Sequence, residues 1–202
     1  MASWSPISRE TPVGKGRIEA FSDGVFAIII TIMVLELHTP DGDNFQALRG
    51  IVPALSGYVL SFVYVGIYWN NHHHLLQASN RVDGLVLWAN LHLLFWLSLV
   101  PFASRWMGDS AFAGPTVAVY GTVLWGAGVA YYLLSRALVR LHGDESVIAS
   151  AIGRDWKGLT SLALYTASVP MGLAFPLAAV AIFGLVALMW LVPDRRIARV
   201  VQ

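Results

Sequence analysis

The 202-residue sequence contains no cysteine, and only 12% of its residues are charged. The absence of cysteine excludes a disulfide framework, a thiolate metal site and a cysteine nucleophile. Soluble domains carry about 25% charged residues, so this chain has too little polar side chain to cover a water-facing surface. Its net charge of +1 provides no field that attracts phosphates, which also excludes a nucleic-acid partner.

Hydrophobic residues make up 56% of the chain, which predicts an all-α membrane protein embedded in the lipid bilayer. A spanning helix needs about 20 mostly apolar residues. Six segments qualify, at residues 18–37, 45–76, 82–102, 115–141, 157–175 and 176–192. The last two share one apolar stretch that only Pro176 divides, so five spans are the alternative.

The segments outside these spans are short, so we expect one six-helix domain over residues 17–193 with tails at 1–16 and 194–202. The first sixteen residues lack an apolar core, and we therefore expect no cleavable signal peptide. Of the 13 basic residues, all but Arg49 and Arg105 fall on one side of the predicted membrane. The positive-inside rule then places both termini in the cytoplasm.

No catalytic motif stands out: the chain has no GxSxG, HExxH, P-loop or paired-carboxylate pattern. We therefore expect a protein that is not an enzyme and has no cofactor. The adjacent histidines His72, His73 and His74 point about 100° apart on a helix, which disfavours a shared metal. We expect His73 and His74 to be solvated and His72 to turn inward toward the first helix.

The first predicted span carries an acid, Asp23, inside its apolar stretch. An aspartate at a helix centre costs about 2.5–3.5 kcal/mol on insertion scales, so it should face a partner or water rather than lipid. Arg17, Trp69 and a histidine of the second span are its candidate partners. The alternative is that Asp23 lies near the interface and is simply solvated.

One face of this span is aliphatic. Ile28, Thr31, Ile32 and Leu35 fall within about 60° of Ile28, whereas Asp23 lies about 140° away. Such stripes are usually core packing, and a single threonine usually bonds to its own helix. Periodicity alone therefore does not indicate a pore. In the third span, Asn90 is predicted to make an interhelical hydrogen bond.

Several of these residues form a recognisable pattern. The opening of the first span, Arg17-x-x-x-Phe21-Ser22-Asp23, resembles the signature of the transmembrane protein 175 family, which includes the lysosomal potassium channel of animals and shorter bacterial relatives. Trp69-x-x-His72, Asn90 and Pro101-Phe102 match further family positions. The chain is thus similar to bacterial members that carry one six-helix repeat.

The resemblance implies a homotetramer in a bacterial plasma membrane, with the first helix of each chain lining a central pore. It implies leak-like K⁺ conduction with weak selectivity over Na⁺. Ile28 would form a hydrophobic constriction or gate, Ile32 and Leu35 further apolar layers, and Thr31 a hydroxyl ring that K⁺ passes transiently. The resemblance also implies a network that anchors the pore helix, formed by Arg17, Phe21, Ser22, Asp23, Trp69 and His72.

Other functions remain open at this point. A proton-coupled or other secondary transporter would need an ionisable relay inside the membrane, for which Asp23 and His92 are the candidates. A membrane enzyme using the histidine cluster and a purely structural membrane protein are the remaining alternatives. Glu36, Asp41 and Asp43 would either concentrate cations at the outer mouth of a pore or be solvated.

Overall fold

The computed structural model describes residues 14–143, 146, 149 and 155–191, and this part of the chain contains helices and no strand. The helices are α1 (Lys15–Leu35), α2 (Leu48–Gln77), α3 (Gly84–Ser98), α4 (Val100–Asp109), α5 (Gly114–His142), α7 (Trp156–Ala174) and α8 (Pro176–Leu191). Residues 1–13 of the predicted amino-terminal tail and all of the predicted carboxyl-terminal tail lie outside the described residues, as do Arg9, Arg154, Arg195, Arg196 and Arg199.

Helices occupy all six predicted positions. Four segments are long and apolar enough to cross a membrane: α1, α2, α3 together with α4, and α5. The shorter apolar helix α8 and the 19-residue α7 fill the last two positions. The division at Pro176 is confirmed, because α7 ends at Ala174 and α8 begins with the proline, which is well suited to the first helical position. The last apolar stretch is therefore two helices and not one.

The third span differs from the prediction, which ended it at residue 102. The helix breaks at Leu99 and resumes as α4, with Pro101 in its first turn. Proline has no N–H to donate to the preceding turn, which explains the break. The chain then stays helical to Asp109, and Arg105 pairs with Asp109 four residues on. The second helix also begins later than predicted, at Leu48 rather than residue 45.

The helix α5 is the centre of the bundle. It packs against α3, α4, α7 and α8, and its side chains Tyr120, Leu124, Leu134 and Leu138 are fully buried. At Gly126 the indole ring of Trp96 lies so close that an added Cβ would come within 2.3 Å of it. A glycine is therefore required where α3 crosses α5.

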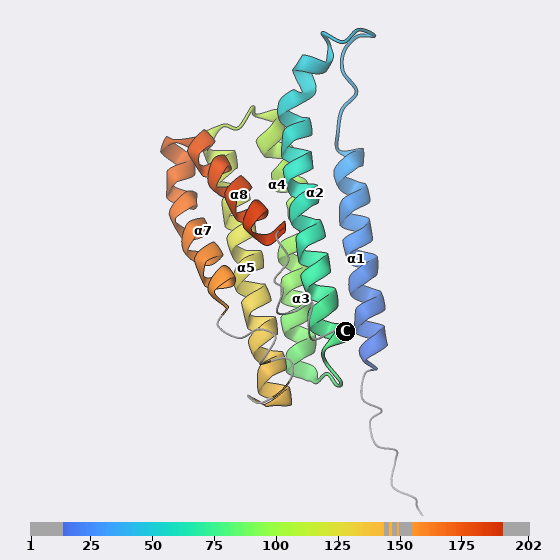
Figure 1. The fold of residues 1–202 in the computed structure, drawn as a ribbon. Coiled ribbons are helices and arrows are strands. Elements are labelled where there is room, and N and C mark those ends of the chain that lie inside the picture. The colour runs from blue at the N-terminus through green and yellow to red at the C-terminus, as the bar shows by residue number, and fades with distance from the viewer. Residues whose placement is uncertain (1–13, 144–145, 147–148, 150–154, 192–202) are drawn as a thin grey trace, which may run out of the picture.

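The helix α1 lies at the edge of the bundle, beside α2 (Figure 1). It buries one side against the rest of the chain. The buried residues are Ile18, Ser22, Phe26, Ile29 and Met33. The described part of the chain leaves the other side of this apolar helix uncovered.

Candidate functional site

The uncovered side of α1 contains the aliphatic stripe that the sequence indicates. Ile28 is 58% exposed, Ile32 41% and Leu35 81%, and Thr31 is also exposed. These residues thus do not pack in the core of their own subunit, which the spacing alone had favoured. We call the surface formed by Ile28, Thr31, Ile32 and Leu35 the α1 face.

The hydroxyl of Thr31 donates a hydrogen bond to the carbonyl oxygen of Ile28, at 2.9 Å. This is the local bond expected for a threonine in a helix. The hydroxyl hydrogen is therefore committed, while the oxygen keeps acceptor capacity on the exposed side. An oxygen in this position can face a cation.

A buried polar cluster joins α1, α2 and α3. The side-chain amide of Asn90 donates to Ser22 Oγ at 3.0 Å, and its carbonyl oxygen lies 2.7 Å from His72 Nε2. Because an amide oxygen can only accept, this histidine nitrogen is the donor. All three side chains are at least 98% buried, and the interhelical bond predicted for Asn90 is confirmed. His72 faces inward but reaches α1 through Asn90 and by ring contact with Phe26, at 5.5 Å between centroids.

A second connection between α1 and α2 lies nearer the surface. The indole nitrogen of Trp69 donates to the Asp23 carboxylate at 3.0 Å, and the ring of His73 stacks on Trp69 at 5.9 Å. At the start of α1, Lys15 Nζ donates to the carbonyl of Gln77, the last residue of α2, at 3.2 Å. The sequence names Trp69 as a candidate partner of Asp23; it gives no signal for Lys15, because that contact depends on where α2 ends.

The structure does not bring every residue of the expected anchoring network together. Phe21 is 56% exposed and lies about 20° from Ile28 around the helix, so it extends the α1 face instead of joining the cluster. Arg17 is exposed and forms no ion pair with another described residue. Within the expected anchoring network, the residues of α1 that contact other helices through polar side chains are thus Ser22 and Asp23.

At the other end of α1, Glu36 is paired. Arg105 of α4 contacts the Glu36 carboxylate, and the same guanidinium bonds Asp109 at 3.3 Å and His38 Nε2 at 3.3 Å. The pair fixes the end of α1 to α4 and neutralises the acid locally. A groove runs beside this contact, between α1 and α4, and includes Ile28 and Ile32 in its lining.

His92 and His74 take no part in these contacts. His92 is exposed, and its Nε2 accepts a hydrogen bond from Trp96 at 3.0 Å, whereas the Asp23 carboxylate accepts from Trp69. His74 has a buried Nδ1 with no partner in the described part of the chain. In residues 14–143, 146, 149 and 155–191, no three or more histidine, aspartate or glutamate side chains are arranged so that together they could hold a metal ion.

Asn90→Ala should lower the stability of the folded chain by about 1–2 kcal/mol, because it leaves the Ser22 and His72 polar atoms buried without their partner. Thermal unfolding in detergent measures this. The matched control is Asn70→Ala, on the exposed side of α2, which should leave the midpoint unchanged. Equal shifts for the two variants would contradict an energetic role for the cluster.

Comparisons with known proteins place this geometry in context. Residues 17–101 match the family described as endosomal/lysosomal potassium channel TMEM175, the transmembrane protein 175 family. A potassium channel of Chryseobacterium is 50% identical over 185 residues, which cover 92% of this chain and 96% of the relative. A chicken protein named endosomal/lysosomal proton channel TMEM175 is 34% identical over 50% of this chain and 22% of its own length.

The fold also matches a solved structure. The crystal structure of a lysosomal potassium-selective channel TMEM175 homolog from Chamaesiphon minutus superposes with a TM-score of 0.74 at 24% identity. The match covers 87% of this chain and 95% of that one. At this identity the likeness concerns the fold.

Proposed function

Because the chain belongs to the TMEM175 family, we propose that four copies assemble around a central axis and conduct K⁺ through a pore lined by α1 of each copy. The family is one of ion channels and not of enzymes, and no cofactor is expected in it. The protein is an integral membrane protein. The observation that carries the proposal is the α1 face, an aliphatic stripe that no other described residue of the subunit buries.

The pore would be narrowest at Ile28. Four branched side chains around an axis exclude water from a narrow passage, and such a constriction gates conduction by dewetting. Ile32 and Leu35 would add further apolar layers along the same stripe. Conduction then requires the ring of Ile28 side chains to widen or rotate.

Thr31 would provide the polar ligands for K⁺ inside the pore. It lies about 4.5 Å further along the helix axis than Ile28, at 1.5 Å per residue. Four hydroxyl oxygens at that level can replace part of the hydration shell of K⁺ during its passage. Hydroxyls supply fewer and weaker ligands than a filter of backbone carbonyls, so we expect weak selectivity for K⁺ over Na⁺.

The mouth of this pore would take its negative charge from Asp41 and Asp43. Both are exposed in the loop after α1, whereas Glu36 is paired with Arg105. The pairing supports a structural role for Glu36 and leaves the two aspartates to attract cations. Their effect should fall at high salt, because charges this exposed are screened.

We place the protein in a bacterial plasma membrane with both termini cytoplasmic. In support, α1 begins, α2 ends, α3 begins, α5 ends and α7 begins at one end of the bundle (Figure 1). The described basic residues near that end are Lys15, Arg17, Arg81, Arg136, Arg140 and Lys157. Basic residues concentrate on the cytoplasmic side of membrane proteins.

Flux measurements in liposomes test the proposal. Purified protein is reconstituted with an outward K⁺ gradient, and K⁺ release is compared with Na⁺ release from matched vesicles. We expect K⁺ flux that rises with the gradient without saturating, and slower Na⁺ flux. Saturable flux coupled to protons or to a solute would instead support the secondary transporter and contradict a channel.

The assembly has its own test at Gly24. This residue is exposed beside Ala20 and Ala27, and a Cβ built on it meets no atom within 4 Å. Small residues let membrane helices approach closely. Gly24→Leu should therefore leave the subunit folded but abolish the tetramer in native mass measurements.

Gly184→Leu in α8 is the matched control, because its added Cβ also meets nothing within 4 Å. It should leave the tetramer intact. A tetramer that survives Gly24→Leu would contradict contact between subunits through this side of α1.

A further inference from the structure

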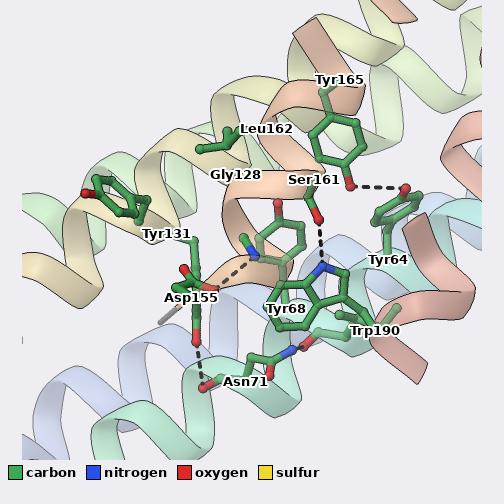
Figure 2. Close-up of a pocket in the computed structure, with 13 residues that line it drawn as sticks. Tyr64, Tyr68, Asn71, Gly128, Tyr131, Asp155, Ser161, Leu162, Tyr165 and Trp190 are labelled. Atoms are coloured by element: carbon green, nitrogen blue, oxygen red, sulfur yellow. Dashed lines mark hydrogen bonds between the residues drawn. The ribbon is translucent and has the colours of Figure 1, made fainter. Parts of the chain in front are cut away.

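A small cavity lies among α2, α5, α7 and α8, apart from the α1 face (Figure 2). Its volume is about 40 Å³, and neither α1, α3 nor α4 contributes a lining residue. Each enclosed water needs about 10–15 Å³ by this measure, so the cavity has room for about three waters. A guest in it is limited to a few non-hydrogen atoms.

The walls of this cavity are aromatic with a single acid. The rings are those of Tyr64, Tyr68, Tyr131, Tyr132, Tyr165 and Trp190. The acid is Asp155, which Figure 2 shows beside Tyr131, and none of the lysine, arginine and histidine residues that the structure describes lines the cavity. Aromatic faces attract ammonium ions through the negative charge density of the ring face. One such contact already exists outside the cavity, where Lys157 Nζ lies 5.8 Å from the centre of the Trp190 ring.

Most hydrogen-bond donors of the walls are engaged with the protein. Tyr165 donates to the Tyr64 hydroxyl at 3.1 Å, and Tyr64 donates to the carbonyl of Phe183 at 2.7 Å. The indole nitrogen of Trp190 donates to Ser161 Oγ at 2.9 Å. The walls therefore offer few free N–H or O–H groups to a guest.

By contrast, several hydrogen-bond acceptors of the walls have no donor among the described residues. One oxygen of Asp155 caps α7 by accepting from Gly158 N at 2.9 Å, and the second oxygen makes no ion pair with a described residue. The side-chain nitrogen of Asn71 donates to the carbonyl of Ile67 at 2.8 Å, and its side-chain oxygen accepts no bond from a described residue. The Tyr68 hydroxyl has no hydrogen-bond partner in the described part of the chain. These groups would best bind a small molecule that donates hydrogen bonds and carries positive charge.

We propose that the cavity is a binding site for a small primary ammonium ion of the size of methylammonium. Such an ion provides three N–H donors for the carboxylate, amide and hydroxyl oxygens, and a cation for the aromatic rings. K⁺ has the charge but no donors, and three oxygens replace its hydration shell poorly. The site is separate from the α1 face, so this proposal does not depend on conduction.

The test uses the purified full-length protein in detergent and ¹³C-labelled methylammonium. Saturation transfer from the aromatic protons to the methyl group reports binding, and unlabelled ammonium and K⁺ are added as competitors at equal concentration. We expect ammonium to displace the probe and K⁺ to leave it in place. Asp155→Asn should weaken binding about tenfold, because the amide keeps the cap on α7 but loses the charge.

Asp83→Asn is the matched control. Asp83 caps α3 in the same way, by accepting from Val86 N at 2.9 Å, and lies outside the cavity. This variant should bind the probe as the original protein does. Absence of saturation transfer, displacement by K⁺ equal to that by ammonium, or the same affinity in Asp155→Asn and Asp83→Asn would each overturn the assignment.

Discussion

Ile28→Asn should raise the K⁺ conductance of the reconstituted protein by about tenfold or more and reduce its time spent closed. Each tenfold change corresponds to about 1.4 kcal/mol in the barrier. In the proposed tetramer, four asparagine side chains would place polar groups where four isoleucines would exclude water, so the proposed constriction would stay wetted. Because Ile28 is 58% exposed in its own subunit, the substitution should leave the fold intact. Single-channel recording in planar bilayers measures both effects.

The matched control is Leu188→Asn. Leu188 is 61% exposed on α8, which is separated from α1 by α2 (Figure 1). The same polar group placed there should leave conductance unchanged. Currents unaltered by Ile28→Asn, or raised equally by both variants, would remove Ile28 from the conduction path.

Asp23→Ala should impair assembly far more than it changes permeability. The carboxylate accepts from Trp69 at 3.0 Å and thereby holds α1 against α2. A hydrogen bond to a charged group contributes about 1.5–3 kcal/mol, and in the proposed tetramer it would recur in each subunit. We expect a tetramer fraction lowered at least about tenfold, with an unchanged K⁺/Na⁺ ratio in the tetramers that remain. Native mass measurement and bi-ionic potentials give the two quantities.

Trp69→Phe tests the same bond from its other side and should reproduce most of the assembly defect. The double variant should then be little worse than either single variant, because the two residues act through one contact. Trp88→Phe, on the exposed side of α3, is the control for loss of an indole. A fully assembled Asp23→Ala tetramer with altered selectivity would show that Asp23 contacts the ions instead of holding the helix.

Much of this arrangement follows from local sequence. Apolar runs determine the helices because unpaired backbone groups cannot remain in lipid, and proline explains the break at Pro176. The spacing of Ile28, Thr31, Ile32 and Leu35 defines one side of a helix whatever surrounds it. Asn90 could be predicted as a contact because a polar side chain in an apolar span needs a partner.

The sequence could not predict which side of α1 the chain would cover. That depends on how α1 packs on α2, which periodicity does not encode. Phe21 was placed in the anchoring network by the family resemblance alone, although helical spacing already puts it about 20° from Ile28. The pairing of Glu36 with Arg105, 69 residues apart, also depends on how the helices pack and could not be predicted from the sequence. The aromatic cavity was missed because its lining comes from four helices whose crossing points are set by packing.

Modification of Ile28→Cys during K⁺ flux tests the central claim most directly. The chain has no cysteine of its own, so a charged methanethiosulfonate reagent labels this position alone. If α1 of each subunit surrounds the conduction path, labelling should change K⁺ flux sharply, while labelling Leu188→Cys should leave it unaltered. Complete labelling at residue 28 with undiminished, unaltered flux would mean that ions pass elsewhere.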